Sequence, residues 1–216
     1  MNALTIYVNI VNMSNMLNIP IETDSSKRTD IMTAAFTQFS QYGFEKTSMA
    51  DIARATGMSR ASLYTYFDNK EEIFRGACIH INAQSLADVA HALAAEEPTL
   101  SLTKKMENAL LARYGRLLDI AQSPHGSEIY NERNRLCGAL AQDSVRDLRA
   151  LLAKALKAAD QLGEIELKPS GLSPAAAAEI LQMAAAGLKA EAPDLKTYTK
   201  RLQGLVGLFF DGLARS

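Results

Sequence analysis

A short polar segment, SRASLYTYFDNK at residues 59–70, carries side chains that could contact a nucleic acid. Its spacing predicts a helix over 60–67, in which Leu63 and Phe67 lie four positions apart and face the core. The side chains between them would then be exposed, and they include arginine, hydroxyl groups and two tyrosines. A surface of this composition suits DNA better than it suits protein packing.

Four residues of this segment could read bases in the major groove. Arg60 lies near the start of the predicted helix, where a guanidinium can bond to O6 and N7 of guanine. Ala61 and Thr65 offer methyl groups to thymine, and Ser62 offers a hydroxyl to a base or a phosphate. The alternative for Arg60 is an ordinary solvated surface position.

Five further residues are predicted to contact phosphates. Tyr64 and Tyr66 flank the helix, where hydrogen bonds to phosphates fix register without reading sequence. Lys70 adds charge to the start of the next helix, and Thr47 and Ser48 precede another helix start, a feature that favours anions. The alternative for the tyrosines is that they pad the short helix against its neighbours.

The surrounding elements would position this helix after a tight turn. A first helix is predicted over 27–42 and a second over 48–56, where Ser48 and Asp51 have the spacing of a capping box. Gly57 supplies the positive φ that the following turn requires. Two helices joined by a turn of three residues, 57–59, form the helix-turn-helix arrangement, whose second helix enters the major groove.

The rest of the chain also shows helical periodicity. Strand signals are scarce, so we predict an all-α protein of about nine helices. After the first three, the remaining helices are predicted at 69–93, 100–122, 126–138, 142–162, 174–190 and 195–213. The final one carries Gly204, Leu208 and Gly212 away from its main apolar stripe, which indicates a second packing surface.

We expect three parts in the chain. Residues 1–24 form a flexible extension, 25–72 a three-helix DNA-binding domain, and 73–216 a larger helical domain for ligand binding and dimerisation. The extension contains no lysine or arginine in its first 21 residues and so lacks the charged start of a signal peptide. Met13 and Met16 suggest that the natural start lies further in, so the first 15 or so residues could be foreign to the natural protein.

Composition limits the possible classes of function. The 216 residues are 48% hydrophobic and 22% charged, with a net charge of −1, an ordinary globular balance. Residues 25–70 nevertheless hold six basic and four acidic side chains. Two distant cysteines fit a reducing cytoplasm, and no spacing predicts a metal, a cofactor or a catalytic centre. We therefore expect a cytoplasmic protein that is not an enzyme and does not bind membranes.

Candidate ligand contacts lie in the larger domain. One stripe of the 100–122 helix places Arg113 among apolar residues, and a buried charge needs a partner. That partner is either an internal acid or an anionic ligand, and a snorkelling side chain is a third possibility. The complete candidate set is Met106, Leu110, Arg113, Tyr114, His125, Tyr130, Cys137 and Met183. Each of them could equally be ordinary core.

From Lys27 to Phe74 the sequence resembles the DNA-binding domain of the tetracycline-repressor (TetR) family. The matching segments are AAFTQFSQYGFEKTSMADIA, TGMS and LYTYFDNKEEIF, in that order and without gaps. The resemblance implies that eight of the nine residues above, all except Thr47, lie where family members contact operator DNA. It also implies a homodimer through the last two helices and a pocket for a small-molecule effector. Ala50 departs from the arginine that many members carry there.

Two functional hypotheses follow. The first is a bacterial repressor that binds a palindromic operator as a dimer and is released by a small molecule. The second is a helical ligand-binding or interaction protein that has lost sequence-specific DNA binding, as the modest basic excess and Ala50 would allow.

Overall fold

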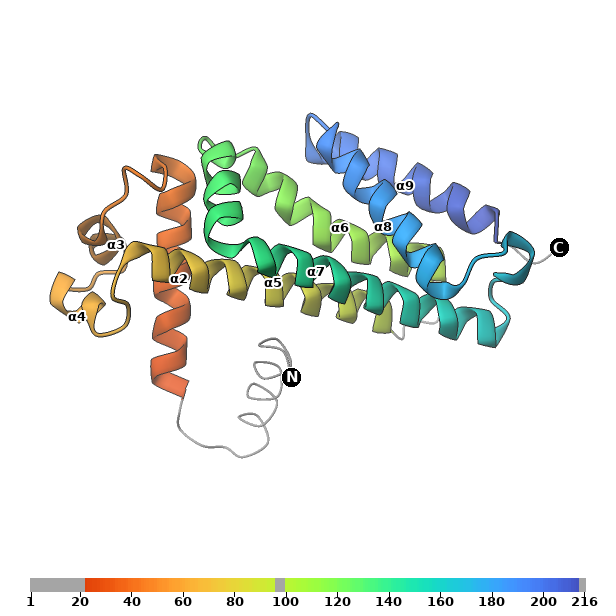
Figure 1. The fold of residues 1–216 in the computed structure, drawn as a ribbon, viewed down its shortest axis with the longest axis horizontal. Coiled ribbons are helices and arrows are strands. Elements are labelled where there is room, and N and C mark those ends of the chain that lie inside the picture. The colour runs from red at the N-terminus through yellow and green to blue at the C-terminus, as the bar shows by residue number, and fades with distance from the viewer. Residues whose placement is uncertain (1–21, 96–99, 214–216) are drawn as a thin grey trace.

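The computed structural model describes residues 22–95 and 100–213, and the regular elements of this part are all helical (Figure 1). The all-α prediction is therefore confirmed. The elements are α2 (Glu22–Tyr42), α3 (Met49–Ala55), α4 (Arg60–Tyr64), α5 (Lys70–Ala94), α6 (Leu102–Ala121), α7 (Gly126–Leu162), the 3-10 helix η1 (Lys168–Ser170), α8 (Pro174–Ala190) and α9 (Leu195–Asp211). The predicted extension over 1–24 lies outside the described residues, except for its last three, which belong to α2.

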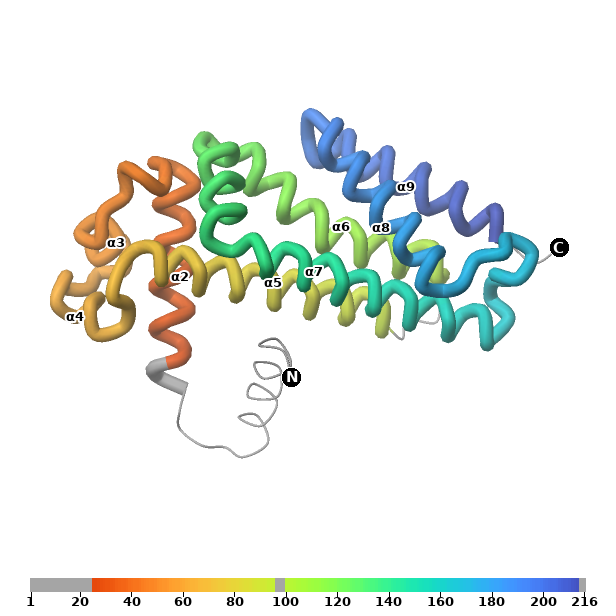
Figure 2. Tube along the Cα trace, viewed as in Figure 1, coloured from red at the N-terminus to blue at the C-terminus, as the bar shows by residue number. Residues whose placement is uncertain are grey.

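The helices form a small head and a longer body. The head is defined here as α2, α3 and α4, and the body as α5 to α9. Figure 1 shows the head at one end of the molecule, with α2 lying across the start of α5. In Figure 2 the traces of α5, α6 and α7 run beside one another, and α8 and α9 cover them further along.

Side-chain caps begin the short helices of the head where the sequence predicts them. The Ser48 hydroxyl accepts a hydrogen bond from the Asp51 N–H at 3.2 Å, and the Asp51 carboxylate accepts from the Ser48 N–H at 3.0 Å. Ser59 caps α4 by accepting from the Ser62 N–H at 3.0 Å. Such caps satisfy N–H groups that a helix start leaves unpaired, each worth about 1 kcal/mol.

Aromatic residues form the core of the head. The rings of Phe39 and Phe44 lie 5.1 Å apart, and that of Phe74, from α5, lies 5.6 Å from Phe39. The same core includes Ile129 and Cys137 of α7. The packing of the head thus continues past residue 72 into α5 and α7, while the proposed domain boundary stays a prediction.

The structure corrects the predicted number of helices at one place. Separate helices were expected over 126–138 and 142–162, whereas α7 runs from Gly126 to Leu162 with a kink at Cys137. Cys137 has non-helical dihedrals, φ −137° and ψ 24°, and Gly138 follows it. Glycine weakens a helix, and tertiary packing keeps the chain helical on both sides of the kink.

Candidate nucleic-acid interface and ligand cavity

The head contains two short helices joined by a tight turn, as predicted. Gly57 has φ +67°, a conformation that glycine adopts without steric cost. Leu63 and Phe67 are buried, whereas Arg60, Ala61 and Thr65 are exposed and Ser62 is half-buried. The polar side of α4 therefore faces away from the core.

Arg60 and Tyr64 contact each other on this exposed side. The guanidinium Nη2 lies 3.3 Å from the Tyr64 hydroxyl, and its central carbon lies 5.6 Å from the centroid of the tyrosine ring. Both side chains are exposed, so each could turn to a phosphate or a base. The contact joins Arg60, which is predicted to contact a base, to Tyr64, which is predicted to contact a phosphate.

Thr65 and Tyr66 end the polar surface of α4. The Thr65 hydroxyl donates to the Ser62 carbonyl at 2.7 Å, which leaves its methyl group as the part available for a base contact. Tyr66 is half-buried against the core of the head, and its carbonyl accepts from Arg28. Arg28, which the sequence analysis missed, also lies 4.2 Å above the ring of Phe67 and thereby joins α2 to the end of α4.

Two predicted phosphate contacts have internal partners. The Thr47 side chain is buried, and its hydroxyl donates to the Gly43 carbonyl at 2.7 Å. Lys70 Nζ donates to the carbonyls of Phe44 at 2.8 Å and Glu45 at 3.1 Å. An ammonium has three protons, so Lys70 retains one for a phosphate while it ties α5 to the loop before α3. Its DNA contact stays a prediction.

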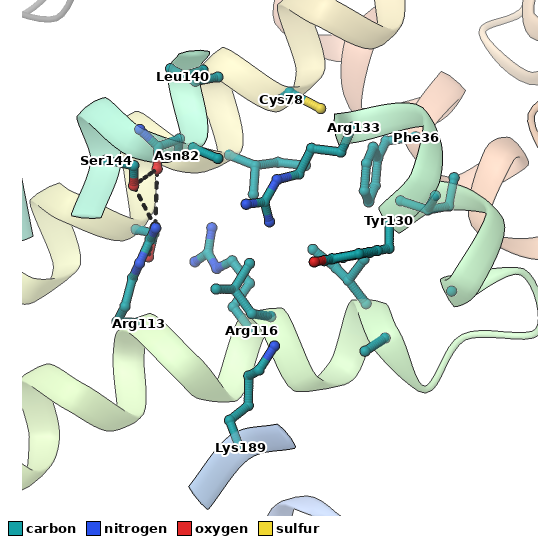
Figure 3. A pocket seen from close by; sticks show the side chains of 18 residues that line it. Phe36, Cys78, Asn82, Arg113, Arg116, Tyr130, Arg133, Leu140, Ser144 and Lys189 are labelled. Atoms are coloured by element: carbon teal, nitrogen blue, oxygen red, sulfur yellow. Dashed lines mark hydrogen bonds between the residues drawn. The ribbon is translucent and has the colours of Figure 1, made fainter. Parts of the chain in front are cut away.

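A cavity of about 80 Å³ lies among the helices of the body, next to Phe36 of the head. Its walls come from α2, α5, α6, α7 and one residue of α8, and Phe36 is the contribution of the head (Figure 3). Of the predicted ligand contacts, Arg113 and Tyr130 line it. The remaining walls near the head are largely apolar, among them Ile120 and Ile129.

Arg113 is buried at one end of this cavity, with 5% of its surface exposed. Its guanidinium donates to Asn82 Oδ1 at 3.0 Å, to Ser85 Oγ at 3.4 Å and to the hydroxyl of Ser144. Burial lowers the pKa of Arg113 from its ordinary value. Among the described residues no carboxylate pairs with it, so neutral oxygens orient the charge without neutralising it.

Three more basic side chains line the cavity. Arg116 pairs with Asp88 at 2.8 Å, whereas Arg133 and Lys189 have no ion-pair partner in residues 22–95 and 100–213. Burial lowers the pKa of Lys189, and the nearby charge of Arg133 lowers it further. Figure 3 shows Arg116, Arg133 and Lys189 pointing toward one central space, with Tyr130 beside it.

Three of the predicted ligand contacts belong to the core of the body instead. Met106, Leu110 and Tyr114 are buried there, and the Tyr114 hydroxyl accepts from Gln182 Nε2 at 2.8 Å. Met183 lies on the outer side of α8 and is 59% exposed. Met106 and Leu110 share the apolar stripe of α6 with Arg113, but, unlike Arg113, none of these four predicted contacts lines the cavity.

The other two predicted contacts lie between the cavity and the head. Cys137 is buried in the core of the head beside Cys78, which lines the cavity, and both are free thiols. A hydrogen bond to Cys137 and, after it, burial raise the pKa of the Cys78 thiol. His125 precedes α7, and its Nδ1 lies 3.0 Å from the carboxylate of Glu128.

The sequence analysis missed most of the polar side chains of the cavity. Arg133 and Ser144 come from α7, and Asn82 comes from α5. Their signal was present, because Arg133 lies four positions after Ile129 and Arg116 lies three after Arg113, each on the face that lines the cavity. Only the packing of three helices shows that these faces converge.

The start of α7 also contacts the loop that leads into α3. Glu128 Oε1 accepts a hydrogen bond from the Glu45 N–H at 2.9 Å, and the His125 N–H donates to the Ser40 carbonyl at 3.3 Å. The hydrogen bond from Glu45 holds the pKa of Glu128 below its ordinary value. The helix that carries Tyr130 and Arg133 into the cavity is thus bonded to the head.

The outer sides of α8 and α9 carry exposed apolar residues. Ile180 and Met183 on α8 are 48% and 59% exposed, and Leu208 on α9 is 76% exposed. Gly187 and Gly204 have open space where a side chain would lie. Apolar patches of this kind, next to small residues, are typical of helix interfaces.

The described residues contain no group of three or more His, Cys, Asp or Glu side chains that could hold a metal. In the same residues, no helix is long and apolar enough to cross a membrane.

The geometry of the head is that of a helix-turn-helix domain, and comparison with known proteins shows which family this domain matches. The sequence model of bacterial regulatory proteins of the tetR family matches residues 31–77. This segment of the chain therefore matches the DNA-binding region of TetR-family helix-turn-helix transcriptional regulators.

Two curated relatives each match about a quarter of the chain or less. Over 54 residues the chain is 41% identical to YfiR, an uncharacterized HTH-type transcriptional regulator of Bacillus subtilis, a match that covers 25% of this chain and 26% of YfiR. Over 45 residues it is 44% identical to IcaR of Staphylococcus epidermidis, the negative transcriptional regulator of the biofilm operon icaADBC. That match covers 21% of this chain and 24% of IcaR.

A solved structure matches most of the fold. SmeT, the repressor of the Stenotrophomonas maltophilia multidrug efflux pump SmeDEF, has a TM-score of 0.63 at 17% identity. The match covers 88% of this chain and 91% of SmeT. At that identity the similarity supports the arrangement of the helices in head and body and nothing finer.

Proposed function

We propose that the protein is a homodimeric repressor that binds a palindromic operator and is released by a small molecule. The observation that carries the proposal is the exposed polar side of α4, which follows a tight turn and bears Arg60, Ser62 and Thr65. In this arrangement α4 enters the major groove and α3 lies across the backbone. Relatives with a similar head, such as IcaR, are named as negative regulators, which favours repression.

Dimerisation through α8 and α9 would place two heads on one operator. The support is the exposed apolar surface of Ile180, Met183 and Leu208, beside glycines that allow close approach of a second copy. Two such heads read half-sites that are about 34–36 Å apart or a multiple of this distance. The body then acts as a spacer between the heads.

The cavity is the proposed effector site. It is enclosed by α5, α6 and α7 and includes Phe36 of the head, so a ligand inside it touches both parts of the molecule. A ligand shifts the arrangement of the heads only by as much as it binds the two arrangements unequally. Contacts between the start of α7 and the loop before α3 give it a physical route.

A gel-shift experiment tests the proposed function directly. The full chain is mixed with the DNA upstream of its own gene and, at the same salt concentration, with a scrambled DNA of equal length. Repression requires tighter binding to the first, by about a thousandfold or more for a specific operator. Equal binding to both would favour the alternative of a head that has lost sequence-specific DNA binding.

A further inference from the structure

The cavity contains more positive charge than its own walls neutralise. Four basic side chains line it, none of its lining residues is acidic, and Asp88 pairs with Arg116 from outside the lining. We propose that the ligand of this cavity is an anion with an apolar body, specifically a carboxylate that binds between Arg113, Arg133 and Lys189. The inference rests on the proposed role of the cavity as the effector site, and it names the chemical class of effector.

Arg113 is a buried cation whose charge is not neutralised within the described part of the chain. A buried charge is costly unless it is paired, and Arg113 is 5% exposed without a carboxylate partner among the described residues. Asn82, Ser85 and Ser144 accept hydrogen bonds from the guanidinium and hold it in place. The guanidinium is thus already positioned before a ligand binds. An incoming anion would be attracted to its charge, because no carboxylate of the described residues neutralises it.

The position of the other two cations is the second step. Arg133 and Lys189 come from α7 and α8 and point toward one central space (Figure 3), and Arg113 of α6 lines the same cavity. Burial and, after it, the like charge of Arg133 hold the pKa of Lys189 below its ordinary value. An oxyanion in the centre would satisfy all three groups and return the pKa of Lys189 toward normal.

The remaining walls determine the rest of the ligand. Phe36, Leu117, Ile120 and Leu140 line the cavity and offer no charge, so they suit an aliphatic or aromatic body. The volume of about 80 Å³ is well below the ~300–1,000 Å³ of sites for drug-sized ligands. A short-chain or single-ring carboxylate fits this limit better than a large conjugate does.

Paired probes test the proposal with the full-length protein. Isothermal titration with benzoate and benzamide, and with hexanoate and hexanamide, changes the charge while the apolar body stays nearly constant. We expect each carboxylate to bind at least about tenfold more tightly than its amide. Phenyl phosphate distinguishes a phosphate site from a carboxylate site, because the proposal expects it to bind more weakly than benzoate.

Variants assign the effect to the cavity. Arg133→Gln removes a half-buried cation without a partner among the described residues and should weaken benzoate binding about tenfold or more, with little change for benzamide. Arg146→Gln, on the exposed side of the same helix, should leave both affinities unchanged. Lys189→Gln removes another cation of the cavity and serves as the test if Arg133→Gln fails to fold.

Three outcomes would overturn the proposal: equal affinity for acids and amides, no binding of any anionic probe, or unchanged benzoate affinity in both cavity variants. Tighter binding of phenyl phosphate than of benzoate would overturn the assignment to a carboxylate. Binding of the ligand-free protein to upstream DNA is measured separately by gel shift. The proposal of a carboxylate ligand can therefore be wrong while the protein still binds its operator. Loss of operator binding with carboxylate binding intact would likewise be detected.

Discussion

The carboxylate of Glu128 lies 2.9 Å from the backbone nitrogen of Glu45 and joins the first turn of α7 to the loop before α3. The same segment of α7, residues 126–136, carries Tyr130 and Arg133 into the cavity. It ends at the kink of Cys137, where the helix has non-helical dihedrals. A ligand that displaces this segment would therefore act on the loop that positions α3.

Glu128→Ala should uncouple the cavity from the head. The substitution removes a charge-assisted hydrogen bond, which we expect to lower the free energy of unfolding by about 1 kcal/mol because the site is partly exposed. Benzoate should bind as in the wild type yet change operator affinity less. Chemical denaturation and gel shifts with and without benzoate measure the two effects.

Asp143→Ala is the control for this experiment, since Asp143 lies on the same helix and pairs only with Arg146 among its ion-pair contacts in the described part of the chain. It should leave the ligand response intact. A full benzoate response in Glu128→Ala would show that the signal does not pass through this contact.

The same contact predicts a dependence of stability on pH. Because the folded protein holds the pKa of Glu128 below its ordinary 4.5, the stabilisation is complete above about pH 4.5 and is lost as the pH falls through the lowered value. Glu128→Gln imitates the protonated group. The difference in unfolding free energy between the wild type and this variant should therefore shrink as the pH falls from about 7 to about 3. A difference that does not change over this range would contradict the assignment.

Arg60→Ala should weaken operator binding selectively. The loss of a guanidinium from the exposed side of α4 is expected to cost about 1–3 kcal/mol and to relax the preference at particular base pairs. Lys154→Ala is the control, because it removes a cation from an exposed position of α7 in the body. It should have little effect on operator affinity. The affinities of both variants for a set of operator sequences test these expectations. An equal loss of affinity on every sequence would show that Arg60 contacts a phosphate and not a base.

Leu208→Glu should separate the dimer. A charge on the outer side of α9 would be buried between two copies, which costs far more than exposure to water. Leu162→Glu, at the end of α7, is a close control because both leucines are 76% exposed. Sedimentation measures the mass, and operator affinity should fall with the dimer. A Leu208→Glu protein that remains dimeric would place the interface elsewhere.

The caps, the turn and the buried positions of the head could be predicted from the sequence because their signals are local, although α2 begins earlier and α4 ends earlier than predicted. A cap and its partner, such as Ser48 and Asp51, lie three positions apart, and the turn needs one glycine, Gly57. Leu63 and Phe67 follow a simple helical spacing and are buried as expected. Local rules of this kind need no knowledge of the rest of the molecule.

The cavity could be predicted only in part, because it depends on how distant helices pack. The apolar stripe of α6 correctly identified Arg113 as a buried charge, but Met106 and Leu110 of the same stripe belong to the core of the body. The hydrogen-bond partners of Arg113 include Asn82 and Ser144, which lie on two other helices. Neither spacing nor composition indicates that these helices meet.

Footprinting of the DNA upstream of the protein's own gene, with and without benzoate, tests the central claim most directly. The account predicts a protected palindrome with half-sites about 34–36 Å apart, or a multiple of this, and loss of protection when the ligand is added. Equal protection of scrambled DNA, at the same salt concentration, would contradict the assignment of the head as a sequence-specific DNA reader.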